Sequence, residues 1–278
     1  MIPSSLARTL DPRVPSNLMI LIFAPLVALA IGVLRLSTGL PLLEAILNAA
    51  GAGAFTGLAW VIGRELDPDH NFTAYFASIL MAIALFIVDT PYLMPLITIV
   101  VALRIVNRST GLRPRLTDLL VLIGLAGVTV ALDGFWLIGL IAALTFVLNA
   151  LLPDSTRTNN LTGAVVALLL TGVISVFTAG NTPLTFMPDV PVALAAAAIS
   201  IAYLVIVLRA PTQLRSVGDH TGHPLLRQRV LAGQLLALVA VIAYMIWHGT
   251  PGVTALLPIW TGVIGVVIRD LAERRGYG

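Results

Sequence analysis

Two short polar stretches hold most of the side chains in this chain that could bind a metal ion. The stretch "DPDHN" begins at residue 67 and the stretch "GDHTGH" begins at residue 218; together they supply Asp67, Asp69, His70, Asp219, His220 and His223. Carboxylates and imidazoles are ligands that suit zinc, manganese or iron. If the two stretches meet in the fold, they predict a divalent metal site; no other cofactor is expected.

Turn formation is the alternative interpretation of the same residues, and we favour it. Asp, Pro, Asn and Gly are common in turns for purely conformational reasons. Asp69 or Asn71 is expected to cap the helix that follows, and Asp219 could neutralise Arg215 or Arg227. The two stretches lie about 150 residues apart and neither has the spacing of a known metal motif.

The composition identifies the environment in which these stretches lie. Hydrophobic residues make up 58% of the 278-residue chain, its mean hydropathy is +1.00, and charged residues contribute only 10%. Soluble domains contain about 25% charged residues. The sequence therefore predicts an all-α, polytopic transmembrane helical bundle whose main partner is the lipid bilayer.

Two absences restrict the chemistry further. The chain has no cysteine, and all 16 of its basic residues are arginine. Disulfides, thiol nucleophiles and iron–sulfur clusters are excluded, as are a lysine Schiff base and a P-loop lysine. The motifs H-E-x-x-H and G-x-S-x-G are also absent. The net charge of +3 does not indicate nucleic-acid binding, because the arginines follow the membrane topology.

About ten apolar runs are long enough to be considered as membrane spans, given that a helix needs about 20 residues and somewhat fewer when arginines flank it. They are 18–34, 42–63, 73–88, 92–106, 117–132, 135–152, 161–178, 190–208, 230–247 and 252–268. The fourth and fifth are the weakest. Because successive runs are joined by alternating outer and inner turns, the pattern predicts helical hairpins in series.

The arginines determine the predicted orientation. With the N-terminus inside, every arginine except Arg35 falls in an N-terminal, inner-loop or C-terminal segment. This agrees with the positive-inside rule and predicts that both termini are cytoplasmic in a protein of the cell membrane. We expect one integral membrane domain over 1–278, with a cytoplasmic segment at 1–17 and a cytoplasmic tail at 269–278. The first run resembles a signal peptide near "ALA", but its apolar character continues to Leu34, so an uncleaved helix is favoured.

Polar residues within the spans form the second group of candidates, because ionisable groups in lipid are costly. Glu44 and Asn48 lie one turn apart in the second run, and Arg35 lies across the short turn before it. We predict an Arg35–Glu44 ion pair that closes the first hairpin. Gln234 is the main polar candidate in the ninth run, and no carboxylate lies at the middle of a span.

Three functions are compatible with this sequence. The favoured one is a non-enzymatic membrane protein, either a transport component or a subunit of a larger membrane complex or homo-oligomer. The second is a cytoplasmic-face, metal-dependent enzyme acting on a lipid-linked or phosphorylated substrate, with phosphate held by Arg108, Arg113, Arg115 or Arg227. The third is an uncoupled channel or flippase using polar faces of the seventh to ninth helices.

Overall fold

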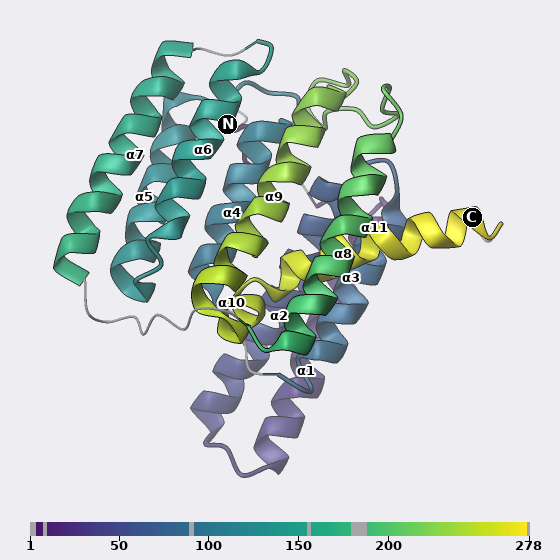
Figure 1. The fold of residues 1–278 in the computed structure, drawn as a ribbon. Coiled ribbons are helices and arrows are strands. Elements are labelled where there is room, and N and C mark those ends of the chain that lie inside the picture. Colours follow the sequence, from purple (N-terminus) through teal and green to yellow (C-terminus); the bar gives the residue numbers. More distant parts are fainter. Residues whose placement is uncertain (1–3, 8–9, 89–91, 155–156, 179–187, 277–278) are drawn as a thin grey trace. The chain divides into compact units, whose positions relative to one another are not determined.

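The fold is all-helical, as predicted. A computed structural model describes all residues except 1–3, 8–9, 89–91, 155–156, 179–187 and 277–278 (Figure 1). Over the described residues it contains helices and one isolated bridge, between Val217 and Pro224. The helices are α1 (Pro15–Ser37), α2 (Leu42–Leu66), α3 (Asn71–Ala84), α4 (Leu93–Asn107), α5 (Leu116–Asp133), α6 (Leu137–Leu151), α7 (Arg157–Thr178), α8 (Val190–Arg209), α9 (Arg227–His248), α10 (Thr250–Ala255) and α11 (Leu257–Arg274).

The helices are grouped in two compact units. The terminal unit comprises Thr9–Leu93 and Thr254–Gly278, in which α2 packs against α1, α3 and α11. The central unit comprises Met1–Arg8 and Met94–Val253, in which α5, α6 and α7 lie side by side while α9 contacts α6 and α8 (Figure 1). Hence the C-terminal helix packs with α2 and α3, which are far from it in sequence.

Among the described residues, six helices are long and apolar enough to cross a membrane: α1, α2, α5, α7, α8 and α9. α3, α4 and α6 are apolar but shorter. The fifth predicted run, expected to be weak, is therefore one of these six, because its helix continues for 18 residues through Asp133. The tenth run is not one helix: it is divided into the short α10 and the long α11, which starts with Pro258 in its first turn.

Large apolar side chains cover the outer faces of two of these helices. On α1, Leu29 is 65% exposed, and on α7, Phe177 is 84% exposed. Other apolar side chains on the same helices are also exposed, among them Ile22, Leu26, Val33, Leu169, Val173 and Val176. Contiguous exposed apolar surface of this kind is rare on soluble monomers. It suits a protein embedded in a membrane.

The start and end of α5 are fixed by local interactions. The Asp118 carboxylate accepts hydrogen bonds from the Arg115 main-chain N–H at 3.0 Å and from the hydroxyls of Ser4 and Ser5, at 3.0 and 2.6 Å. At the other end, Gly134 adopts a left-handed conformation with φ of 67°, which glycine accommodates without strain. The N-terminal segment is thereby attached to the first turn of α5.

Candidate functional site

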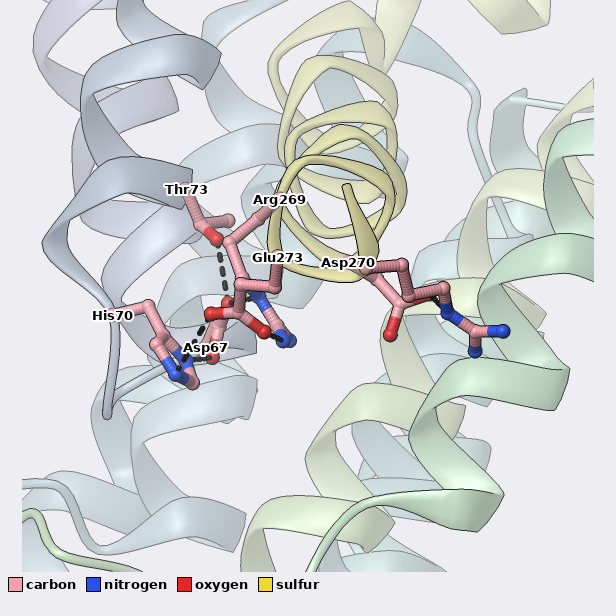
Figure 2. Close-up of polar contacts among 7 residues, drawn as sticks. Asp67, His70, Thr73, Arg269, Asp270 and Glu273 are labelled. Atoms are coloured by element: carbon pink, nitrogen blue, oxygen red, sulfur yellow. Dashed lines mark hydrogen bonds and ion pairs between the residues drawn. The ribbon is translucent and has the colours of Figure 1, made fainter. Parts of the chain in front are cut away.

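Asp67 is the centre of a polar network in the terminal unit, directly after α2. Its side chain is only 9% exposed. One carboxylate oxygen lies 2.8 Å from Nδ1 of His70, and the other accepts a hydrogen bond from the Thr73 hydroxyl at 2.5 Å (Figure 2). Both contacts span the tight turn between α2 and α3, so Asp67 holds this turn closed.

Helix α11 completes the network from the other side. The Arg269 Nε donates to Asp67 at 3.1 Å, and its Nη1 donates to Glu273 at 2.8 Å. Glu273 in turn lies 3.4 Å from Nε2 of His70. Asp67, His70, Glu273 and Arg269 therefore form a closed ring that joins the C-terminal helix to the α2–α3 turn (Figure 2). We call these four residues and Thr73 the Asp67 network.

Glycines allow the three helices to approach closely enough for this ring to form. A Cβ atom at Gly63 in α2 would lie 2.6 Å from the Cα atom of Ala74 in α3. A Cβ atom at Gly265 in α11 would lie 2.9 Å from the main-chain oxygen of Thr73. Small residues at such crossings are typical of helix packing in membranes, and here they set the separation that Asp67 and Arg269 span.

The charges of the network largely balance one another. Its two carboxylates, Asp67 and Glu273, face one guanidinium and one imidazole. The hydrogen bond to Asp67 raises the pKa of His70 above its ordinary value of 6.5; burial and Arg269 oppose this shift, and Glu273 supports it. Protonation of His70 is thus favoured by the carboxylates that contact it.

The residues predicted to cap α3, Asp69 or Asn71, are wrong. The N-cap position of α3 is His70, which makes no capping hydrogen bond, rather than Asp69 or Asn71. The Asn71 side-chain oxygen instead accepts a hydrogen bond from Arg64 in α2. Asp67 also contacts the start of α3, where it accepts a hydrogen bond from the side-chain hydroxyl of Thr73.

The second candidate stretch forms a hairpin-like loop in the central unit. Its main chain is closed by a hydrogen bond from the Gly218 N–H to the His223 carbonyl at 2.8 Å. The main-chain N–H of His220 donates to Thr110 at 3.0 Å, and that of Asp219 to Ser109 at 3.3 Å. Nε2 of His220 lies 3.3 Å from the Ala7 carbonyl oxygen. The loop is therefore attached to the α4–α5 turn mainly through its backbone.

The predicted metal ligands are divided between the two units. Asp67 and His70 contact each other in the terminal unit. The central unit contains Asp219, His220 and His223. In the described part of the chain, no group of three or more His, Cys, Asp or Glu side chains is placed to hold a metal ion. The candidate metal site remains a prediction, for which metal analysis is the test.

The polar residues predicted within the spans have different surroundings from those expected. Among the ion pairs of the described residues none joins Arg35 to Glu44. The Asn48 side chain donates to the Glu44 main-chain carbonyl at 2.8 Å, a contact within one helical turn. In the central unit, the Gln234 side-chain oxygen accepts a hydrogen bond from Arg227 at 3.1 Å. Gln234 is therefore part of a partly buried contact with the first residue of α9.

Three members of the Asp67 network were missed by the sequence reasoning: Thr73, Arg269 and Glu273. Arg269 and Glu273 were assigned to a cytoplasmic tail beyond the last span, but α11 continues through both to Arg274. A local signal exists only for the contact between Arg269 and Glu273. They lie four residues apart with opposite charges, which places them on one side of a helix.

Comparisons of the chain with protein families, with curated proteins and with solved structures gave no match.

Proposed function

We propose that the protein is a non-enzymatic, multi-pass protein of the cell membrane, with about ten spans and both termini in the cytoplasm. In this proposal it acts as a transport component or as a subunit of a membrane complex. Its exposed apolar faces on α1 and α7 would contact lipid or neighbouring membrane subunits.

The observation that carries the non-enzymatic part of the proposal is the closed Asp67 network. Both carboxylate oxygens of Asp67 are engaged by protein groups, His70 on one and Thr73 and Arg269 on the other. A general base or metal ligand needs a lone pair directed to substrate or ion. In this network the same lone pairs serve to fasten helices together.

A topology experiment tests the membrane part of the proposal. Reporters fused after Arg115, after Arg157 and at the C-terminus are expected to report the cytoplasm. Reporters placed near Pro91, Pro188 and Gly249 are expected to report the outside. An inverted result at any one of the inner positions would show that the number of spans is wrong, and α4, the shorter helix preceding α5, is the first to reconsider.

A further inference from the structure

Arg229 is the most deeply buried charged side chain among the described residues of the central unit. It lies in the first turn of α9 and is 1% exposed. Its Nη1 donates to the Val106 carbonyl at 3.0 Å and to the Asn149 side-chain oxygen at 2.9 Å, while its Nη2 donates to the Pro153 carbonyl. Asn149 is fixed in turn, because its amide donates to Asn160 at 2.8 Å. One guanidinium thus links the ends of α4 and α6 to α9.

All three acceptors of Arg229 are uncharged. None of the ion pairs formed by the described residues includes it. Buried charges are normally paired, since desolvation of an unpaired charge costs several kcal/mol. Its Nε atom is also buried and has no hydrogen-bond partner. The positive charge of Arg229 is therefore solvated by the protein but not neutralised by direct contact.

Two further arginines lie near this buried charge. Arg108, 8% exposed, donates from Nη2 to the Asp154 main-chain carbonyl at 3.0 Å. Arg113 contacts the Asp154 carboxylate at 3.4 Å. Asp154 is the acidic neighbour that acts on Arg229, and Arg108 and Arg113 are the basic ones. Three guanidiniums thus share a single carboxylate, and we call these four residues the Arg229 cluster.

The single carboxylate is also weakly held. The side chains of Arg113 and Asp154 are 67% and 59% exposed, and an exposed ion pair is worth less than about 1 kcal/mol. Arg108 and Arg229 lie buried behind this exposed pair, and the Nε atom of Arg108 is, like that of Arg229, buried without a hydrogen-bond partner. An incoming anion could therefore displace the Asp154 carboxylate from Arg113 at little cost.

The backbone at the cluster is strained. Arg108 has φ of 52° and Asp154 has φ of 64°, the two non-glycine residues with positive φ among those described. Aspartate tolerates this conformation, but for a long side chain such as arginine it is uncommon. Such outliers persist where the surrounding structure enforces them, often at ligand sites. The Arg108 side chain donates to the main-chain carbonyl of Asp154, so a hydrogen bond joins the two residues that have this conformation.

We infer that Arg108, Arg113 and Arg229 form a binding site for a phosphate group, carried by an anionic lipid or by a small phosphorylated ligand. Guanidinium groups bind phosphate through paired, charge-assisted hydrogen bonds. Arg113 provides the exposed contact, and Arg108 and Arg229 provide the charge behind it. A phosphate would neutralise the excess positive charge of the cluster, which Asp154 alone leaves uncompensated.

The test uses the full-length protein in nanodiscs made only of phosphatidylcholine. Its melting temperature is measured with added inorganic phosphate, and separately in discs that also contain phosphatidylglycerol. The variants are Arg113→Gln and Arg108→Gln. The control is Arg13→Gln, which removes the same charge from an exposed site in the terminal unit. Arg113→Gln is expected to keep the fold, because the pair it breaks is exposed.

The proposal predicts that the wild type and Arg13→Gln are stabilised by a phosphate-bearing species. In Arg113→Gln and Arg108→Gln the apparent affinity should fall about tenfold or more, the factor for one charged hydrogen bond. A response to phosphatidylglycerol alone identifies a lipid headgroup, and a response to inorganic phosphate identifies a small ligand. Equal responses in Arg113→Gln and Arg13→Gln, or no response in any variant, would overturn the proposal.

Discussion

The Asp67 network and the Arg229 cluster use the same kinds of residue with opposite results. In the Asp67 network two carboxylates meet one arginine and one histidine, and each charged group contacts an oppositely charged partner. In the Arg229 cluster three arginines share one exposed carboxylate. The first arrangement neutralises itself within the protein. The second leaves positive charge that an external anion can neutralise.

The balance of charge distinguishes a structural cluster from a candidate binding site more clearly than residue type does. Asp67 and His70 belong to the most conspicuous stretch of the sequence, yet they are occupied by contacts within the protein. The arginines near the start of α9 are expected from the positive-inside rule alone. Arg229 is nevertheless buried without an acidic contact. The balance of charge in the folded protein, rather than the density of polar residues in the sequence, indicates which cluster is open to a ligand.

The largest predicted effect is the loss of Arg229. Arg229→Ala removes three hydrogen bonds, two of them buried, and leaves the acceptors on Val106, Asn149 and Pro153 without this donor. We expect the free energy of unfolding in mixed micelles to fall by about 2 to 3 kcal/mol. The matched control is Arg113→Ala in the same cluster, for which a loss below about 1 kcal/mol is expected. Similar losses in both variants would mean that the buried contacts of Arg229 contribute little.

A smaller effect is expected for Arg269, because the ring that it closes is partly accessible. Arg269→Gln leaves the Asp67 carboxylate without its guanidinium partner, and we expect a loss of about 2 kcal/mol, less than for a fully buried pair. The control is Arg274→Gln in the same helix, which breaks the more exposed pair with Asp270 and should cost below about 0.5 kcal/mol.

A double-mutant cycle sharpens this prediction. Asp67→Asn combined with Arg269→Gln should destabilise less than the sum of the single changes, because the double variant leaves neither charge unpaired. Strict additivity would show that Asp67 and Arg269 do not interact energetically, and the network would then lose its role as the attachment of α11.

The pH dependence of the Asp67 network gives the smallest effect. The pKa of His70 is raised in the folded protein, so the folded state binds the proton more tightly than the unfolded state does. The resulting stabilisation is fully present below the ordinary pKa of 6.5 and is lost as the pH rises through the raised pKa. The difference in melting temperature between wild type and His70→Gln should therefore shrink as the pH rises from acid to alkaline. A difference that grows with pH would contradict a raised pKa of His70 in the folded protein.

Much of the fold could be predicted from the sequence because a bilayer imposes long apolar helices. Each predicted run overlaps a helix, and the turn around Asp67 was expected from its Asp, Pro and Asn residues. The division of the last run at Leu256 was not foreseen, because its apolar character continues across the break.

The polar contacts were harder to predict because their partners are distant in sequence. Asp67 pairs with Arg269 and Arg229 contacts Asn149, and local spacing carries no information about either contact. The expected Arg35–Glu44 pair shows the opposite error. Proximity across a short turn suggested an ion pair, but among the described residues no ion pair joins the two side chains.

Elemental analysis of the purified protein tests the central claim most directly, that the Asp67 network attaches α11 to the α2–α3 turn and is not part of a metal site. Measurements before and after treatment with a chelator are expected to show no stoichiometric zinc, manganese or iron and an unchanged melting temperature. The same preparation of His70→Gln and of His220→Ala should give the same metal content as the wild type. Stoichiometric metal in the wild type that disappears in either variant would contradict the account, because metal ligands act together.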